Sequence, residues 1–179
     1  GSIPMGVLLS RIFGLGDHRR VGSGNIGATN VLRTGNKRAA ALTLVLDMGK
    51  GLVPVWFFLG WGDLAAQCAG VGAFAGHCLP VWLRFHGGKG VATWFGIAFA
   101  LHWPAGVALA AIWLATTTAL RISSVSALVA GTAGPLVFWA LGRPEAVLAM
   151  ALLGVAIWIT HRSNIGRLRR GEEPRFGQR

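Results

Sequence analysis

The sequence has few charged residues. Only 13% of its 179 residues are charged and 53% are hydrophobic, whereas a soluble domain typically carries ~25% charged residues. The mean hydropathy is +0.56. This composition excludes an ordinary soluble domain and predicts an integral membrane protein.

Acidic residues are the scarcest charged class. The chain has six Asp and Glu residues and 17 Lys and Arg residues, and its net charge is +11. In a soluble protein this excess would point first to nucleic acid. In a membrane chain it is explained by the accumulation of basic residues in cytoplasmic loops, with anionic lipid and anionic substrates as partners. We expect a lipid bilayer as partner and no nucleic acid.

Cysteine and tyrosine contribute little. There is no Tyr, and the two cysteines, Cys68 and Cys78, lie ten residues apart in one apolar segment. This spacing matches no metal or redox motif, so we interpret them as reduced packing residues. The eight tryptophans and 27 glycines fit closely packed membrane helices with aromatic anchors at the interface.

Apolar segments follow one another along the whole chain. A helix needs ~20 residues to cross a bilayer, so the first segment is short and we expect its start to be truncated. We predict an all-α fold, a polytopic membrane helix bundle forming one domain over residues 1–179. Its seven transmembrane segments are predicted at 1–13, 39–60, 65–83, 91–103, 105–120, 125–141 and 146–160.

The basic residues are unevenly distributed between the loops. If the segments alternate in direction, fourteen basic residues share one face and only Arg143 lies on the other, while Arg11 and Lys50 fall within segments. The rich face is predicted to be cytoplasmic, with the N-terminus outside. Its members are Arg19, Arg20, Arg33, Lys37, Arg38, Arg84, Lys89, Arg121, Arg162, Arg167, Arg169, Arg170, Arg175 and Arg179.

Residues 21–37 form the longest polar run before the C-terminal tail. Glycines free the backbone for close approach to a ligand, and several amide groups can then point at one anion. The run predicts a phosphate cradle; a flexible connector is the alternative. It contains Gly22, Gly24 and Gly27, the neutral donors Ser23, Asn25, Thr29 and Asn30, and the cations Arg33 and Lys37.

Two nucleotide-binding motifs are matched only in part. Gly22, Gly24 and Gly27 have the spacing of a dinucleotide fingerprint, but that motif needs a preceding strand, and an apolar run of helical length follows here. Residues 87–90, Gly-Gly-Lys-Gly, lack the upstream glycine and the following Ser or Thr of a P-loop. Both motifs are rejected, although glycines beside Lys89 still suit a phosphate.

Ionisable residues within the apolar segments have two interpretations each. Asp47 and Lys50 lie three residues apart and share a helix face. They form either an ion pair or a contact with substrate, because an unpaired charge at the bilayer centre costs roughly 2.5–3.5 kcal/mol. His77 is either a structural hydrogen-bonding residue or a catalytic one.

Four motifs in register make the chain similar to a known family. They are residues 22–33 (Gly-Ser-Gly-Asn-x-Gly-Ala-Thr-Asn-Val-Leu-Arg), Asp47-x-x-Lys50-Gly51, Gly76-His77 with residues 87–90, and residues 161–168 (His-Arg-x-Asn-Ile-x-Arg-Leu). The chain resembles the bacterial acyl-phosphate:glycerol-3-phosphate acyltransferases. The resemblance implies a seven-helix inner-membrane enzyme that makes lysophosphatidate from acyl phosphate and glycerol 3-phosphate. It also implies that no metal and no cofactor is needed. A soluble enzyme that supplies the acyl phosphate is a further implied partner.

The resemblance also implies roles for individual residues. The catalytic candidates are Ser23, Asn25, His77, Lys89 and Asn164. The phosphate-binding candidates are Gly24, Arg33, Lys89, Ser124, Arg167 and Glu173. Asn30, Asp47 and Lys50 are candidate supporting residues.

Two further considerations bear on the function. Many glycerolipid acyltransferases pair a histidine with an aspartate four residues apart, and this pair deprotonates the acceptor hydroxyl. None of the five histidines here has an acid at that spacing. The donor is therefore expected to be an acyl phosphate, whose own oxygens can accept the hydroxyl proton. The alternative function is a transporter of an organic anion or phospholipid. Transport needs access from both faces. The loops predicted on the outer face are short and carry only one basic residue, which argues against transport.

Overall fold

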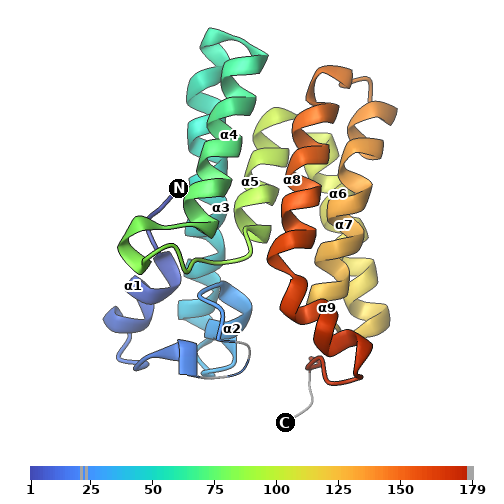
Figure 1. The fold of residues 1–179 in the computed structure, drawn as a ribbon. Helices are drawn as coiled ribbons and strands as arrows, with labels where there is room; N and C mark the ends of the chain where they lie inside the picture. The colour runs from blue at the N-terminus through green and yellow to red at the C-terminus, as the bar shows by residue number, and fades with distance from the viewer. Residues whose placement is uncertain (21, 23, 177–179) are drawn as a thin grey trace. The chain divides into compact units, whose positions relative to one another are not determined.

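The computed structural model describes residues 1–20, 22 and 24–176 of the chain. Within these residues all regular structure is helical, which confirms the predicted all-α class (Figure 1). The chain divides into two compact units, Gly1–Ile97 and Ala98–Arg179.

The first unit contains two long apolar helices, Lys37–Phe58 and Asp63–Cys78. Its helices are α1 (Met5–Ile12), α2 (Ala28–Leu32), α3 (Lys37–Phe58), α4 (Asp63–Cys78) and the first part of α5 (Val91–Leu101), with short turns η1 (His18–Arg20), η2 (Leu59–Trp61) and η3 (Val81–Leu83). Helices α3 and α4 pack against each other (Figure 1). Gly62 reverses the chain between them at φ 102°, a conformation that favours glycine.

Glycine allows α3 and α5 to approach backbone to backbone. A Cβ on Gly51 would collide with the carbonyl oxygen of Thr93, and one on Gly96 would collide with that of Met48. Such contacts are typical of membrane helices, which associate through small residues in the absence of a hydrophobic driving force. The high glycine content thus serves packing as well as turns.

The second unit is built around antiparallel neighbours. After the end of α5 come α6 (Trp103–Leu120), α7 (Ser123–Ala140), η4 (Pro144–Ala146), α8 (Val147–Thr160) and α9 (Arg162–Arg169). Helix α7 packs against both α6 and α8. A Cβ on Gly154 of α8 would meet the carbonyl oxygen of Gly131 in α7, so these two helices also approach at small residues.

The helices match the predicted segments to within a few residues. Among the described residues, four helical stretches are long and apolar enough to span a membrane: Lys37–Trp61, Asp63–Leu83, Trp103–Leu120 and Ser123–Ala140. Pro144–Thr160 with Arg162–Arg169, bent by 57°, makes a fifth if counted as one span, and Val91–Leu101 is shorter. The count of seven spanning segments and the single-domain assignment therefore stay predictions. Helices α2 and α9 were not predicted.

Large apolar side chains are widely exposed. Trp56 and Leu64, for example, are 71% and 75% exposed. So many exposed large apolar side chains are unusual on soluble proteins but are expected where helices face lipid. Trp61, Trp82 and Trp103 are also exposed and lie at or near helix ends, as interfacial anchors should.

Candidate functional site

The polar run at 21–37 folds around the short helix α2. Asn30 in this helix is buried, and its side-chain oxygen lies 3.4 Å from Nη1 of Arg33. Gly22 has φ +58°, and a Cβ there would collide with both Arg33 and Asn30. The Gly22 backbone thus lies against a guanidinium that Asn30 orients. The structure brings Arg33 and Asn30 together, while the binding of a phosphate there stays a prediction.

Of the other residues predicted to bind substrate in this run, the structure describes Gly24 and Asn25. Ser23 lies outside the described residues. Gly24 is exposed, with φ +70°, and lies near the carbonyl oxygen of Arg19. Asn25 is half-buried, and its amide nitrogen lies close to Gly27. The left-handed backbone at Gly24 accounts for glycine at this position.

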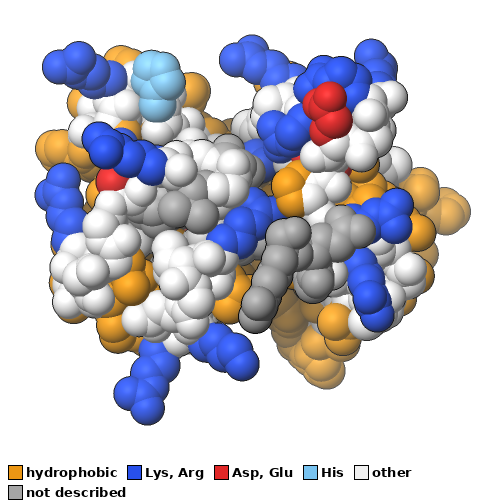
Figure 2. Space-filling model, turned by 90° about the horizontal axis from the view of Figure 1, so that it is seen from below, with side chains coloured by type: hydrophobic (Ala, Val, Ile, Leu, Met, Phe, Trp, Pro, Cys, Tyr) orange, Lys and Arg blue, Asp and Glu red, His pale blue; other side chains and the backbone are white. Residues whose placement is uncertain are grey.

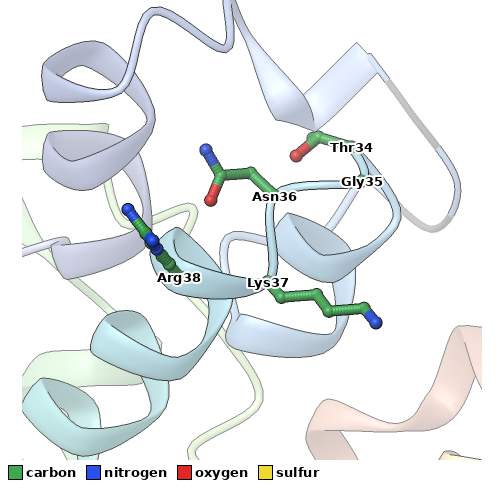
Figure 3. A pocket seen from close by; sticks show the side chains of 5 residues that line it. All are labelled: Thr34, Gly35, Asn36, Lys37 and Arg38. Atoms are coloured by element: carbon green, nitrogen blue, oxygen red, sulfur yellow. The ribbon is translucent and has the colours of Figure 1, made fainter.

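Neighbouring helices hold both ends of the cradle. A Cβ on Gly6 of α1 would collide with the carbonyl oxygen of Ile26, so α1 packs directly on the cradle backbone. At the other end Asn36 caps α3, because its side-chain oxygen accepts a 2.9 Å hydrogen bond from the amide of Ala39. Figure 3 shows a surface depression at this end, lined by residues 34–38. Lys37 there is exposed.

Asp47, Lys50 and His77 form a buried cluster between α3 and α4. Nζ of Lys50 lies 2.9 Å from Oδ1 of Asp47 and 3.0 Å from Nδ1 of His77, and it donates a 2.8 Å bond to the carbonyl oxygen of Ile3. The side chains are at most 6% exposed. The predicted ion pair is therefore present, and His77 joins it. Contact of the pair with substrate stays a prediction.

Residues 87–90 turn back onto the end of α4. The amides of Gly87 and Gly88 donate 3.1 Å hydrogen bonds to the carbonyl oxygens of Cys78 and His77. Gly90 has φ +77°, and a Cβ there would enter the ring of Phe74. The half-buried Lys89 is thus carried on a loop whose backbone is fixed on both sides.

A second cluster gathers four predicted residues in the other unit. Oε1 of Glu173 accepts hydrogen bonds from Ser124 (2.8 Å) and from the amide nitrogen of Asn164 (2.5 Å). Nε of Arg167 lies 2.8 Å from Oε2 of Glu173, whose side chain is 6% exposed. One carboxylate therefore orders a hydroxyl, an amide and a guanidinium.

The end of α9 explains how Glu173 reaches this position. Gly171 adopts φ +72°, its amide donates to Leu168, and the amide of Glu172 donates to the carbonyl of Arg167 at 2.8 Å. These two bonds form a Schellman motif, which reverses the chain after a helix. The tail then returns to the α6–α7 turn, where Phe176 bonds to the carbonyl oxygen of Arg121.

The electrostatics of the carboxylate follow from its donors. Burial of Glu173 opposes its ionisation, but the hydrogen bonds from Asn164, Ser124 and Arg167 outweigh this effect and lower its pKa below the ordinary value. Two buried atoms of the cluster, Oδ1 of Asn164 and Nη2 of Arg167, have no hydrogen-bond partner among the described residues. An acceptor and a charged donor are therefore in place for a polar ligand.

Sequence reasoning missed some of these partners. The carbonyl oxygen of Ile3 gave no signal, since any residue could supply it. The partner of His161 gave no signal either: this residue is buried, and its Nδ1 lies 2.8 Å from the carbonyl oxygen of Ile157. Among the described residues, no group of three His, Cys, Asp or Glu side chains could hold a metal ion.

The chain matches known proteins over nearly its whole length, including both clusters. Residues 1–171 match the family model described as glycerol-3-phosphate acyltransferase. The glycerol-3-phosphate acyltransferase of Dinoroseobacter shibae is 57% identical over 178 residues, covering 99% of this chain and 88% of that protein. The protein of the same name from Roseobacter denitrificans is also 57% identical, covering 100% and 90%.

Two solved structures share the fold. The glycerol 3-phosphate form of PlsY (YgiH), an integral membrane glycerol 3-phosphate acyltransferase, is 34% identical with a TM-score of 0.93, covering 98% of this chain and 90% of that one. The lysophosphatidic acid form is 32% identical with a TM-score of 0.90, covering 98% and 89%. On these matches, the chain belongs to the glycerol-3-phosphate acyltransferase family of integral membrane proteins.

Proposed function

We propose that this protein transfers a fatty acyl group from acyl phosphate to the sn-1 hydroxyl of glycerol 3-phosphate. The products are lysophosphatidate and phosphate, in bacterial phospholipid biosynthesis. The observation that carries the proposal is the likeness to a relative solved in a glycerol 3-phosphate form and in a lysophosphatidic acid form. These two forms correspond to a substrate and a product of the reaction.

The chemistry needs positioning more than it needs an acid–base pair. The hydroxyl oxygen attacks the acyl carbon, an ester bond forms, and the bond between that carbon and the phosphate oxygen breaks. The departing phosphate takes the proton from the hydroxyl, so the step balances without a protein base. Two phosphate groups must be held close together despite their like charges, which calls for cations and backbone amides.

Each unit carries cations and neutral donors of this kind. Arg33, oriented by Asn30, and Lys89, on its glycine-fixed loop, are assigned to phosphate oxygens. Ser23, Asn25 and Asn164 are assigned to orienting the substrates, with Gly24 offering its backbone. In the second cluster, Glu173 and Ser124 hold Asn164 and Arg167 in place for a ligand. No metal or nucleotide takes part in this scheme.

We place the reaction at the cytoplasmic face of the bacterial inner membrane. Glycerol 3-phosphate and an acyl phosphate supplied by a soluble enzyme would both reach the protein there. The support is the fourteen-to-one distribution of basic residues between alternate loops. Figure 2 shows Lys and Arg side chains on the surface seen there, with few Asp and Glu side chains among them.

A paired assay distinguishes this function from transport. Purified protein in detergent micelles is given labelled glycerol 3-phosphate and palmitoyl phosphate, and the same preparation in liposomes is tested for flux of the label. We expect labelled lysophosphatidate in the first assay and no protein-dependent flux in the second. Flux without acyl transfer would replace the proposal with the transporter.

A further inference from the structure

The ammonium group of Lys50 has three polar atoms around it. They are Oδ1 of Asp47 one helical turn away, the carbonyl oxygen of Ile3 before α1, and Nδ1 of His77 at the end of α4. An ammonium has three N–H donors. Two of them bond to Ile3 and His77, while the contact with Asp47 is an ion pair, so three segments of the first unit are tied to one charge.

This arrangement fixes the protonation of the imidazole. Because Nδ1 of His77 accepts from Lys50, the proton of the neutral ring is on Nε2. A general base needs a free lone pair directed at the proton it removes. The only lone pair of this ring is engaged by Lys50, so His77 is not arranged to deprotonate a substrate hydroxyl.

The opposite edge of the ring supports the glycine loop. A Cβ on Gly88 would overlap Nε2 and its neighbouring ring carbons, while the Gly88 amide donates to the carbonyl oxygen of His77. The residue before Lys89 is thus pressed against the imidazole and bonded to the same histidine. Both residues are buried, so the contact has little freedom to shift.

We infer that His77 is a positioning residue: Asp47 and Lys50 lock its ring, and the ring holds the Gly87–Gly90 loop so that Lys89 meets a substrate phosphate. The inference rests on the proposed function for the role of Lys89. It assigns a purpose to the buried ion pair and replaces the catalytic role predicted for His77.

Two isosteric variants separate positioning from proton transfer. His77→Asn places an amide oxygen where Nδ1 was, so it can still accept from Lys50, whereas His77→Gln loses that acceptor. We expect His77→Asn to raise KM for a phosphate substrate while kcat stays within roughly threefold, and His77→Gln to be worse in KM. Loss of a general base would instead lower kcat in both variants by ~10²–10⁴-fold. That result would overturn the inference.

Double variants test the contact between His77 and Gly88 and ask whether the effect of His77 depends on Lys89. His77→Ala/Gly88→Ala should be more active than Gly88→Ala alone, because the new methyl group then occupies space left by the ring. Gly72→Ala in α4, which meets nothing within 4 Å, is the matched control and should be silent. In a Lys89→Ala background, His77→Asn should cause no further rise in KM. If the two substitutions instead have additive effects on KM, His77 does not act through Lys89.

Nuclear magnetic resonance gives a readout independent of turnover. In protein carrying ¹⁵N-labelled histidine, His77 should be a neutral ring protonated on Nε2, and Lys50→Met should change its Nδ1 resonance. A ring protonated on Nδ1 would refute the lock. Absence of acyl transfer by the wild-type protein with this signature intact would count against the proposed function alone.

Discussion

The hydroxyl of Ser124 donates a 2.8 Å hydrogen bond to Oε1 of Glu173, 49 residues further along the chain. This bond joins the first turn of α7 to the tail that follows α9. Asn164 and Arg167 bind the same carboxylate, so the tail is part of the second unit's packing.

Loss of this carboxylate should destabilise the protein. Glu173→Gln should cost about 1.5–3 kcal/mol, the range for a hydrogen bond to a charged group, because Arg167 loses its partner in a largely buried setting. Glu172→Gln is the matched control: its pair with Arg170 is more than half exposed and should contribute at most ~1 kcal/mol. Thermal unfolding in detergent micelles measures both. Equal shifts in Tm would show that burial of the Glu173 cluster is unimportant.

The same carboxylate should make stability depend on pH in one direction. Its folded pKa is lowered from the ordinary value of 4.5, despite burial, by donors that favour the charged form. Its contribution is therefore fully present above the ordinary value and is lost as the pH falls through the folded pKa. The difference in Tm between wild type and Glu173→Gln should be constant from neutral pH down to that region and then shrink. A difference that grows on acidification would contradict this account.

The cations of the first unit should contribute unequally to turnover. Arg33→Ala or Lys89→Ala should remove a charge-assisted contact of ~1.5–3 kcal/mol, roughly 10- to 150-fold in kcat/KM. Lys37→Ala, an exposed residue at the start of α3, should cost much less. Equal, small effects in all three variants would mean that these residues set membrane orientation and do not bind substrate.

Sequence reasoning reached the long helices more readily than the short ones. Helices such as α3 and α6 follow from apolar runs near the length of a membrane span. Helix α9 has a polar sequence, and its end depends on Gly171 and on contacts of Glu173 with distant residues. Helix α2 spans five residues within a glycine- and asparagine-rich run, where local composition favours a loop.

The candidate site shows the same limit. Asp47 and Lys50 could be paired from their spacing, because residues three apart share a helix face. Spacing gave no means of adding His77, 27 residues from Lys50, since that contact depends on how α4 packs against α3. The resemblance grouped Ser124, Asn164 and Glu173 as functional residues but did not predict that they bind one another.

Membrane topology can be tested by thiol labelling in intact cells. In a background lacking Cys68 and Cys78, a cysteine at Thr34 should be protected from an impermeant reagent, whereas cysteines at Gly62 and Gly142 should react. The reason is that the basic loops are expected in the cytoplasm. Labelling of position 34 from outside would reverse the proposed orientation and move the cradle away from its cytoplasmic substrates.

The most direct test of the central claim compares two acyl donors at equal concentration. Purified protein in micelles, with labelled glycerol 3-phosphate, is given either palmitoyl phosphate or palmitoyl-CoA, and labelled lysophosphatidate is measured. The account predicts turnover with the phosphate, whose leaving group carries its own proton acceptor, and essentially none with the thioester, which would need an oriented base. Comparable rates with palmitoyl-CoA would contradict both the donor and the base-free mechanism.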